Sequence, residues 1–162
     1  MTRFALTLPG APRGKVRHRS AIPWAWVIKW LREGKTGRKP IPQQYSDDKY
    51  MAWEDAQARA LQRAWAGRPA LDEPCHLLLV CFFPRPKSRT RKTLPNPRYP
   101  HTAVPDRDNV TKALQDALQK AGVVRNDSRI FDGRTIKWVC AGGEEPRIEL
   151  VLRWGSGCTL LR

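Results

Sequence analysis

The sequence predicts an α+β fold, a single domain in which one mixed β-sheet is packed with helices. Three observations predict it: alternating apolar residues near both ends of the chain, one continuous apolar run, and two segments with helical periodicity. Their expected order is β-α-β-α-β-β. The chain has 162 residues, 41% of them hydrophobic, which suits one core in residues 1–154, followed by a C-terminal tail, residues 155–162.

The first half of the chain supplies three of these elements. Residues 3–8 alternate between apolar side chains and polar or small ones, which is typical of a half-buried strand. Residues 46–66 carry apolar residues at helical spacing, and Ser46 is the expected N-cap. Residues 75–83 form a continuous apolar run, so we expect a central strand that is covered on both faces.

The second half supplies the other three elements. Apolar residues recur at i, i+3, i+4, i+7 and i+8 between residues 110 and 121, which predicts a helix that ends at Gly122. Residues 136–140 and 148–152 then show the pattern of strands. Because two consecutive glycines lie between these strands, we expect them to form an antiparallel hairpin.

Two segments stand outside this pattern. Residues 20–44 are a Trp-rich insertion that carries Trp24, Trp26 and Trp30, and residues 21–31 within it suggest a short helix. The sequence leaves three roles open for this insertion: packing, contact with DNA and dimerisation. Residues 84–105 are rich in proline and carry basic residues but no acid, and a loop of this length in a small domain is usually functional or mobile.

The charge balance indicates a polyanionic partner. Lysines and arginines number 30 against 15 acids, a formal net charge of +15, and such an excess is costly in self-repulsion. The alternatives are a generic basic surface and, less well supported, a membrane surface, because the basic residues do not line an amphipathic helix. The sequence shows no long apolar segment and no signal-peptide pattern, so we expect a cytoplasmic protein. The four cysteines form no C-x-x-C pair, which argues against a zinc site.

Three aspartates and one lysine form the candidate catalytic set. Asp106 and Asp108 open the second predicted helix beside the basic loop, and Asp127 lies in the turn after it. Helix capping explains the first two equally well, and turn formation explains the third. Lys112 and Asp116 lie four and eight residues after Asp108 and also suit a solvated helix face. Phosphodiester hydrolysis, however, uses carboxylates that hold a hard cation such as Mg²⁺ and a positive group that stabilises the transition state.

Residues 105–118, PDRDNVTKALQDAL, resemble the signature P-D-x-D-N-x-x-K-x-x-x-D-A-L of the RusA family of Holliday-junction resolvases. Residues 126–130 are similar to the family's D-D-x-x-I turn, and the match covers most of the chain outside the Trp-rich insertion. The resemblance implies a bacterial or phage homodimer that resolves four-way DNA junctions by paired symmetric nicks, in recombination and repair. It implies Mg²⁺ as the cofactor, with Mn²⁺ as a substitute, and neither a small-molecule cofactor nor a membrane.

The resemblance also assigns roles to single residues. It makes four residues catalytic, with the three aspartates as the metal ligands: Asp106, Asp108, Lys112 and Asp127. Two positions depart from the family pattern, because Arg107 replaces a usually apolar residue and Asn126 replaces an acid. For the DNA phosphates we expect contacts from basic residues of two loops: Arg13, Lys15, Arg17, Arg85, Lys87, Arg89 and Arg91. Two alternatives stay open, a non-catalytic nucleic-acid-binding module and a flap or RNA nuclease with the same metal centre.

Overall fold

The computed structural model describes most of the chain: residues 1–16, 19–45, 47–91 and 95–155. The predictions for Arg17 as a DNA contact, for Ser46 as an N-cap and for tail residues 156–162 lie outside the described residues. Among the described residues, no helix is both long enough and apolar enough to cross a membrane.

The chain divides into two compact units. One consists of Met1–Lys15 with Trp53–Arg162, and the other of Val16–Ala52. The predicted Trp-rich insertion, residues 20–44, falls inside the second unit. In the first unit the elements follow one another along the chain as β1 (Thr2–Pro9), α2 (Asp48–Trp65, which enters this unit at Trp53), β4 (Cys75–Phe83), the 3-10 turn η1 (Lys87–Arg89), β5 (Tyr99–Pro100), α3 (Arg107–Lys120), the 3-10 turn η2 (Asp127–Arg129), β6 (Ile130–Val139) and β7 (Arg147–Trp154).

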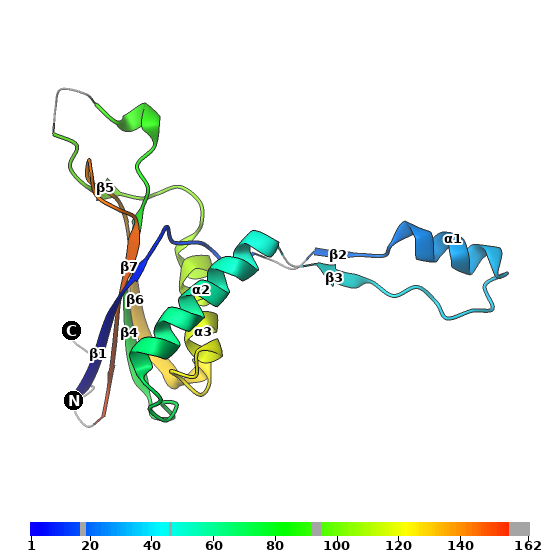
Figure 1. Ribbon diagram of the computed structural model, residues 1–162, viewed down its shortest axis with the longest axis horizontal. Coiled ribbons are helices and arrows are strands. Elements are labelled where there is room, and N and C mark those ends of the chain that lie inside the picture. The colour runs from blue at the N-terminus through cyan, green and yellow to red at the C-terminus, as the bar shows by residue number, and fades with distance from the viewer. Residues whose placement is uncertain (17–18, 46, 92–94, 156–162) are drawn as a thin grey trace. The chain divides into compact units, whose positions relative to one another are not determined.

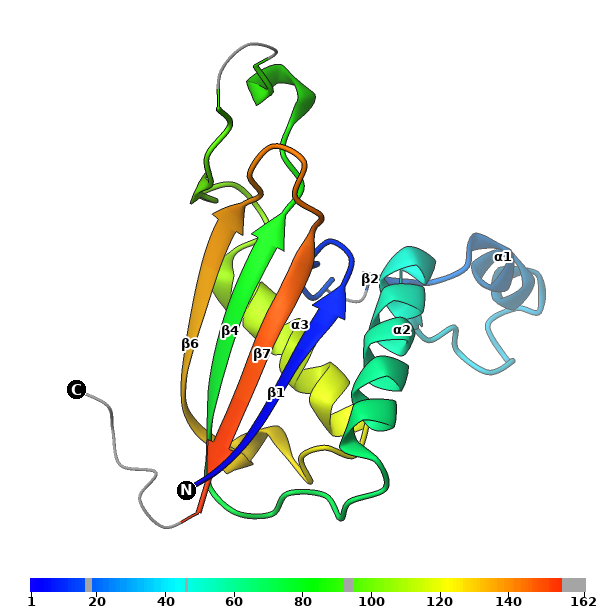
Figure 2. The same cartoon turned by 60° about the vertical axis from the view of Figure 1, so that its left-hand side comes forward.

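A five-stranded mixed sheet organises the first unit. Its strand order is β1-β7-β4-β6-β5, in which β4 and β6 run parallel and the other neighbouring pairs run antiparallel. Figure 2 shows β6, β4, β7 and β1 side by side in this order. The predicted α+β class and the order β-α-β-α-β-β are confirmed, with the short strand β5 added before α3.

The predicted hairpin of residues 136–140 and 148–152 is wrong. These residues do lie in β6 and β7, but β4 is inserted between the two strands and pairs with both of them. The physical reason is that β4 is the most buried strand, so its two edges both need hydrogen-bond partners inside the sheet. The glycines of the connecting loop show only that the chain turns there, and the residues from 140 to 146 are enough to cross the end of β4.

The helices α2 and α3 cover one face of the sheet (Figures 1 and 2). Buried residues of both helices join the core that β4 and β7 contribute: Ala58, Leu61 and Trp65 of α2, and Val110, Leu114, Ala117 and Leu118 of α3. Both helices connect parallel strands, β1 to β4 and β4 to β6, and both crossovers move the same way across the sheet. Because such crossovers are right-handed, both helices fall on the same face.

The other face of β4 is not fully covered, contrary to expectation. Leu77 and Leu79 on the helix side are buried, whereas Leu78 and Val80 on the opposite side are only half-buried. The continuous apolar run therefore predicted the central position of the strand correctly, but not the burial of its second face.

The second unit contains a small two-stranded sheet and one helix. Strands β2 (Arg19–Ala21) and β3 (Gln43–Tyr45) pair antiparallel, and the helix α1 (Trp24–Arg32) lies between them in sequence. The helix suggested within the Trp-rich insertion is thereby confirmed. None of the residues of α1 is buried, so this helix contributes to no core.

Candidate active site

The start of α3 presents two of the predicted aspartates to solvent. Asp106 is the N-cap residue, with extended backbone, but its carboxylate makes no capping hydrogen bond. Asp108 lies in the first turn, where the positive end of the helix dipole stabilises a negative charge. Both residues are exposed, and neither carboxylate forms an ion pair with any described residue. Side-chain capping therefore does not account for Asp106 in this structure.

A lysine that the sequence analysis missed fixes the chain just before Asp106. Lys137 of β6 donates hydrogen bonds from Nζ to the carbonyl oxygens of Ala103, at 2.9 Å, and Pro105, at 2.5 Å. Lys15 adds a backbone hydrogen bond from its N–H to the carbonyl of Asn109, at 2.9 Å. These contacts connect the predicted aspartates to β6 and to the loop after β1, and no local sequence pattern could have revealed them.

The turn η2 brings Asp127 back to α3. The side chain of Asn126 caps this turn by accepting a hydrogen bond from the N–H of Ser128 at 2.9 Å. Lys112 Nζ donates to Asp127 Oδ2 at 2.6 Å. The hydrogen bond to Asp127 raises the pKa of Lys112, and the same bond lowers the pKa of Asp127, so the pair is fully charged at neutral pH. Asn126, which departs from the family pattern, thus has a structural role in holding Asp127.

A surface depression of about 620 Å³ lies between α3 and the first half of β6. Asp108 and Lys112 line it, together with Asp132 and two cations, Arg107 and Arg134. Two further lining residues, Thr111 on α3 and Thr135 on β6, form a hydrogen bond between their hydroxyls at 2.7 Å, which connects the helix to the strand. Asp132, another residue that the sequence analysis did not select, also lies 3.5 Å from His76 Nε2. The depression combines both signs of charge, as a site for a phosphate and a cation requires.

The structure brings only part of the predicted catalytic set together. Lys112 contacts Asp127 and shares the depression with Asp108, but Asp106 does not line it. Among the residues that the structure describes, no three His, Cys, Asp or Glu side chains are close enough to hold a metal ion. In this structure the carboxylate of Asp127 therefore accepts the hydrogen bond from the ammonium of Lys112 and does not join a group of metal ligands.

The helix face of α3 that carries Asp108 and Lys112 also carries Asp116, which forms an ion pair with the loop after β1. Asp116 Oδ2 lies 2.5 Å from Lys15 Nζ, and the two side chains are 23% and 35% exposed. Asp116 thus holds the loop after β1 against α3. Lys15, predicted to contact DNA, is engaged in this ion pair.

The basic loop after β4 is organised by Arg85. Its guanidinium donates to the carbonyl oxygens of Cys140 at 3.0 Å, of Arg89 at 3.2 Å and of Asn96 at 3.2 Å, and also to that of Pro97. These hydrogen bonds connect both arms of the loop to the end of β6. Arg85 was predicted as a phosphate contact, but its donors are engaged by the backbone, which gives it a structural role.

The other predicted DNA contacts that the structure describes are open to solvent, and Arg89 also lies over the ring of Tyr99, 5.5 Å from its centre. Their side chains are exposed: Arg13, Lys87, Arg89 and Arg91. Arg89 and Arg91 also line a cavity of about 510 Å³ within the basic loop. These residues provide positive charge at two loops of the first unit, as expected for a surface that binds phosphates.

The fold and the site together define a small, strongly basic α+β protein that carries exposed carboxylates and a lysine at one depression. The model of a known family, described as endodeoxyribonuclease RusA, matches residues 9–153. The chain therefore belongs to the RusA family, and the predicted resemblance is confirmed. Over 39 residues it is 46% identical to the crossover junction endodeoxyribonuclease RusA of Aquifex aeolicus (strain VF5), a stretch that covers 24% of this chain and 31% of that relative's length.

Proposed function

We propose that this chain is a Mg²⁺-dependent endodeoxyribonuclease that resolves four-way DNA junctions by paired symmetric nicks, in recombination and repair. Membership of a family of endodeoxyribonucleases supports this proposal, as does the printed name of the relative, a crossover junction enzyme. The single observation that carries it is the position of Lys112, which contacts Asp127 and lines one depression with Asp108.

The donor set fits a hard divalent cation in its chemistry. Asp106, Asp108 and Asp127 all offer carboxylate oxygens, which Mg²⁺ and Mn²⁺ prefer as ligands. We propose these three residues as the metal ligands, which requires their carboxylates to come closer together than in the structure described, where Asp127 is engaged by Lys112. When bound, the cation neutralises charge on the scissile phosphate and activates water.

Lys112 is the group that we propose to act on the leaving oxygen. Its raised pKa keeps a proton on Nζ at neutral pH, so it can donate a hydrogen bond to the negative charge that develops there. Asp127 orients this ammonium through the 2.6 Å hydrogen bond. Arg107 and Arg134, which line the same depression, add positive charge that attracts the phosphate.

The substrate and the assembly state are also proposals. The net charge of +15 and the exposed arginines of the two loops support a DNA partner. A homodimer matches the substrate, because two-fold symmetry places one site at each of two equivalent strands.

One experiment tests the activity and separates the alternatives. Labelled four-way junction, flap and duplex DNA are incubated with Mg²⁺ and either the wild-type chain or Asp108→Asn. We expect the wild type to nick the junction at two symmetric positions and Asp108→Asn to bind it without cutting. Preferential cutting of the flap would support a flap nuclease instead, and intact DNA in every lane would leave a non-catalytic binding module.

A further inference from the structure

The second unit exposes large aromatic side chains that no core requires. Trp24 of α1 is 72% exposed and Trp26 is 46% exposed, although an indole buries a large apolar area when it finds a partner. Trp30 is half-buried and donates from Nε1 to the carbonyl oxygen of Gly37 at 3.1 Å, which connects α1 to the segment that follows it. Such exposure of tryptophan on a helix with no buried residue indicates a binding surface.

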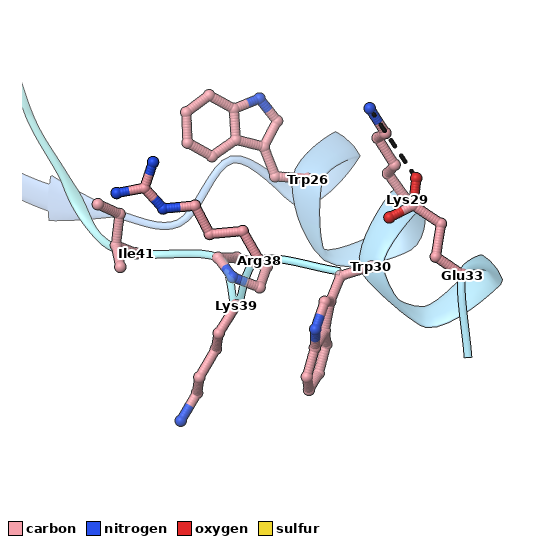
Figure 3. Close-up of a pocket in the computed structure, with 8 residues that line it drawn as sticks. Trp26, Lys29, Trp30, Glu33, Arg38, Lys39 and Ile41 are labelled. Carbon is pink, nitrogen blue, oxygen red and sulfur yellow. Dashed lines mark ion pairs between the residues drawn. The ribbon is translucent and has the colours of Figure 1, made fainter. Parts of the chain in front are cut away.

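A cavity of about 360 Å³ lies between α1 and the segment from Arg38 to Ile41. Figure 3 shows that Trp26 and Trp30 enter it from the helix, while Arg38 and Lys39 come from the facing segment. Because Trp26 and Trp30 are four residues apart, their Cα atoms lie on one side of the helix, about 6 Å apart along its axis. Figure 3 shows that their two indoles point away from each other. The cavity is thus lined by two tryptophans of the helix and by two cations, Arg38 and Lys39, of the facing segment.

The charge of this unit selects among possible partners. Between residues 20 and 42 there are five basic residues and a single acid, Glu33. Glu33 lies 4.0 Å from Lys29, measured from Oε1 to Nζ, and the unit keeps an excess of four positive charges between these residues. This excess of positive charge attracts a polyanion. Tryptophans interleaved with cations are the combination that stacks unpaired bases and neutralises the phosphates between them.

We propose that the cavity between α1 and residues 38–41 binds single-stranded DNA, with unpaired bases stacked on Trp26 and Trp30. Arg38 and Lys39 contact the phosphates of the same strand. Stacking needs no particular base, because every base has an aromatic face, so this site recognises absence of pairing rather than sequence. The binding site lies outside the carboxylate depression and does not depend on the proposed nuclease chemistry.

The test measures binding of the full chain to a fluorescent oligothymidylate by anisotropy, in the presence of EDTA so that no cleavage can occur. Trp26→Ala should weaken binding about ten-fold, which lies in the lower part of the range of affinity lost with one base-stacking contact. Trp26→Phe should keep most of the affinity, because it keeps an aromatic ring. Trp24→Ala is the matched control, because Trp24 lies on the same helix, is more exposed and does not line the cavity. Its affinity should stay within two-fold of the wild type.

Duplex of the same length completes the experiment. We expect Trp26→Ala to leave duplex binding unchanged, and Arg38→Gln to reduce the salt dependence of oligothymidylate binding, since fewer counterions are released. The proposal is overturned if Trp26→Ala binds oligothymidylate as the wild type does, or if it loses duplex affinity equally. It is also overturned if sedimentation shows that Trp26→Ala abolishes self-association while oligothymidylate binding persists. The binding assay does not require cleavage. If the chain binds oligothymidylate as expected but does not cut DNA, only the nuclease proposal is refuted.

Discussion

Replacement of Lys112 by methionine separates a catalytic role of this residue from a structural one. The substitution keeps the unbranched side chain and removes the ammonium that lies 2.6 Å from Asp127 Oδ2. At this distance two unit charges attract by about 1.6 kcal/mol in the dielectric of water. The two side chains are 45% and 31% exposed, so water screens the pair and the fixed side chains lose entropy. We therefore expect a net loss of stability below about 1 kcal/mol.

The effect of Lys112→Met on junction cleavage should be far larger than its effect on stability. A loss below about 1 kcal/mol corresponds to a fall in Tm of at most roughly 4 °C for a chain of this size. Loss of one preorganised donor at a developing negative charge typically reduces kcat by about 10²–10³-fold. The assay combines thermal unfolding with single-turnover cleavage of a four-way junction in Mg²⁺.

Lys120→Met provides the matched control. Lys120 lies on the same helix, is 40% exposed and pairs with Glu54 at 2.8 Å and Asp55 at 2.6 Å, away from the depression. Its substitution should cost at least as much stability as Lys112→Met and leave cleavage intact. If both variants lose cleavage to the same extent, or if Lys112→Met keeps wild-type cleavage, the assignment of Lys112 to the active site is refuted.

Two further predictions concern stability. Hydrogen bonds, the largest from Arg98, lower the pKa of Glu144 to about 2. The stabilisation of the folded state by the Glu144 carboxylate is therefore fully present above 4.5, the pKa of the unfolded chain, and is lost as the pH falls from 4.5 towards 2. The free energy of unfolding is measured in urea at neutral pH and at a pH between 2 and 4.5, and Glu144→Gln should reduce the difference between the two values. A difference equal to that of the wild type would contradict the role of Glu144. Gly133→Ala places a Cβ 2.8 Å from the carbonyl oxygen of Leu77 on β4, so we expect a loss of about 1–3 kcal/mol by thermal unfolding, and an unchanged Tm would refute the close approach of β4 and β6.

The helices were predictable because each is defined by a local pattern. The apolar residues from 110 to 121 repeat at helical spacing, and the observed helix α3 buries that face. Gly122 ends it with a positive φ of 70°, a conformation that glycine adopts without strain. The pairing of β6 and β7 was not predictable in the same way, because periodicity shows which segments are strands but not which strand occupies the neighbouring position.

The candidate site was predictable in its residue types and only partly in its geometry. The spacing of Asp108 and Lys112 on one helix follows from the sequence, and both line the same depression. The contact of Lys112 with Asp127 depends on the path of the chain after α3. Asp132 and Lys137 lie on β6, where the strand pattern carries no sign that Asp132 lines the depression or that Lys137 binds the carbonyls of Ala103 and Pro105 before α3.

The sequence by itself determined the two long helices and four long strands, the excess of positive charge and the signature that places the chain in the RusA family. Only the tertiary structure decided that β4 lies between β6 and β7, that Lys112 is paired with Asp127, and that Arg85 binds backbone carbonyls of its own loop. The physical reason is the range of the interactions. Periodicity and capping act over a few residues, whereas strand pairing, ion pairs and buried hydrogen bonds join residues that meet only after the chain has folded.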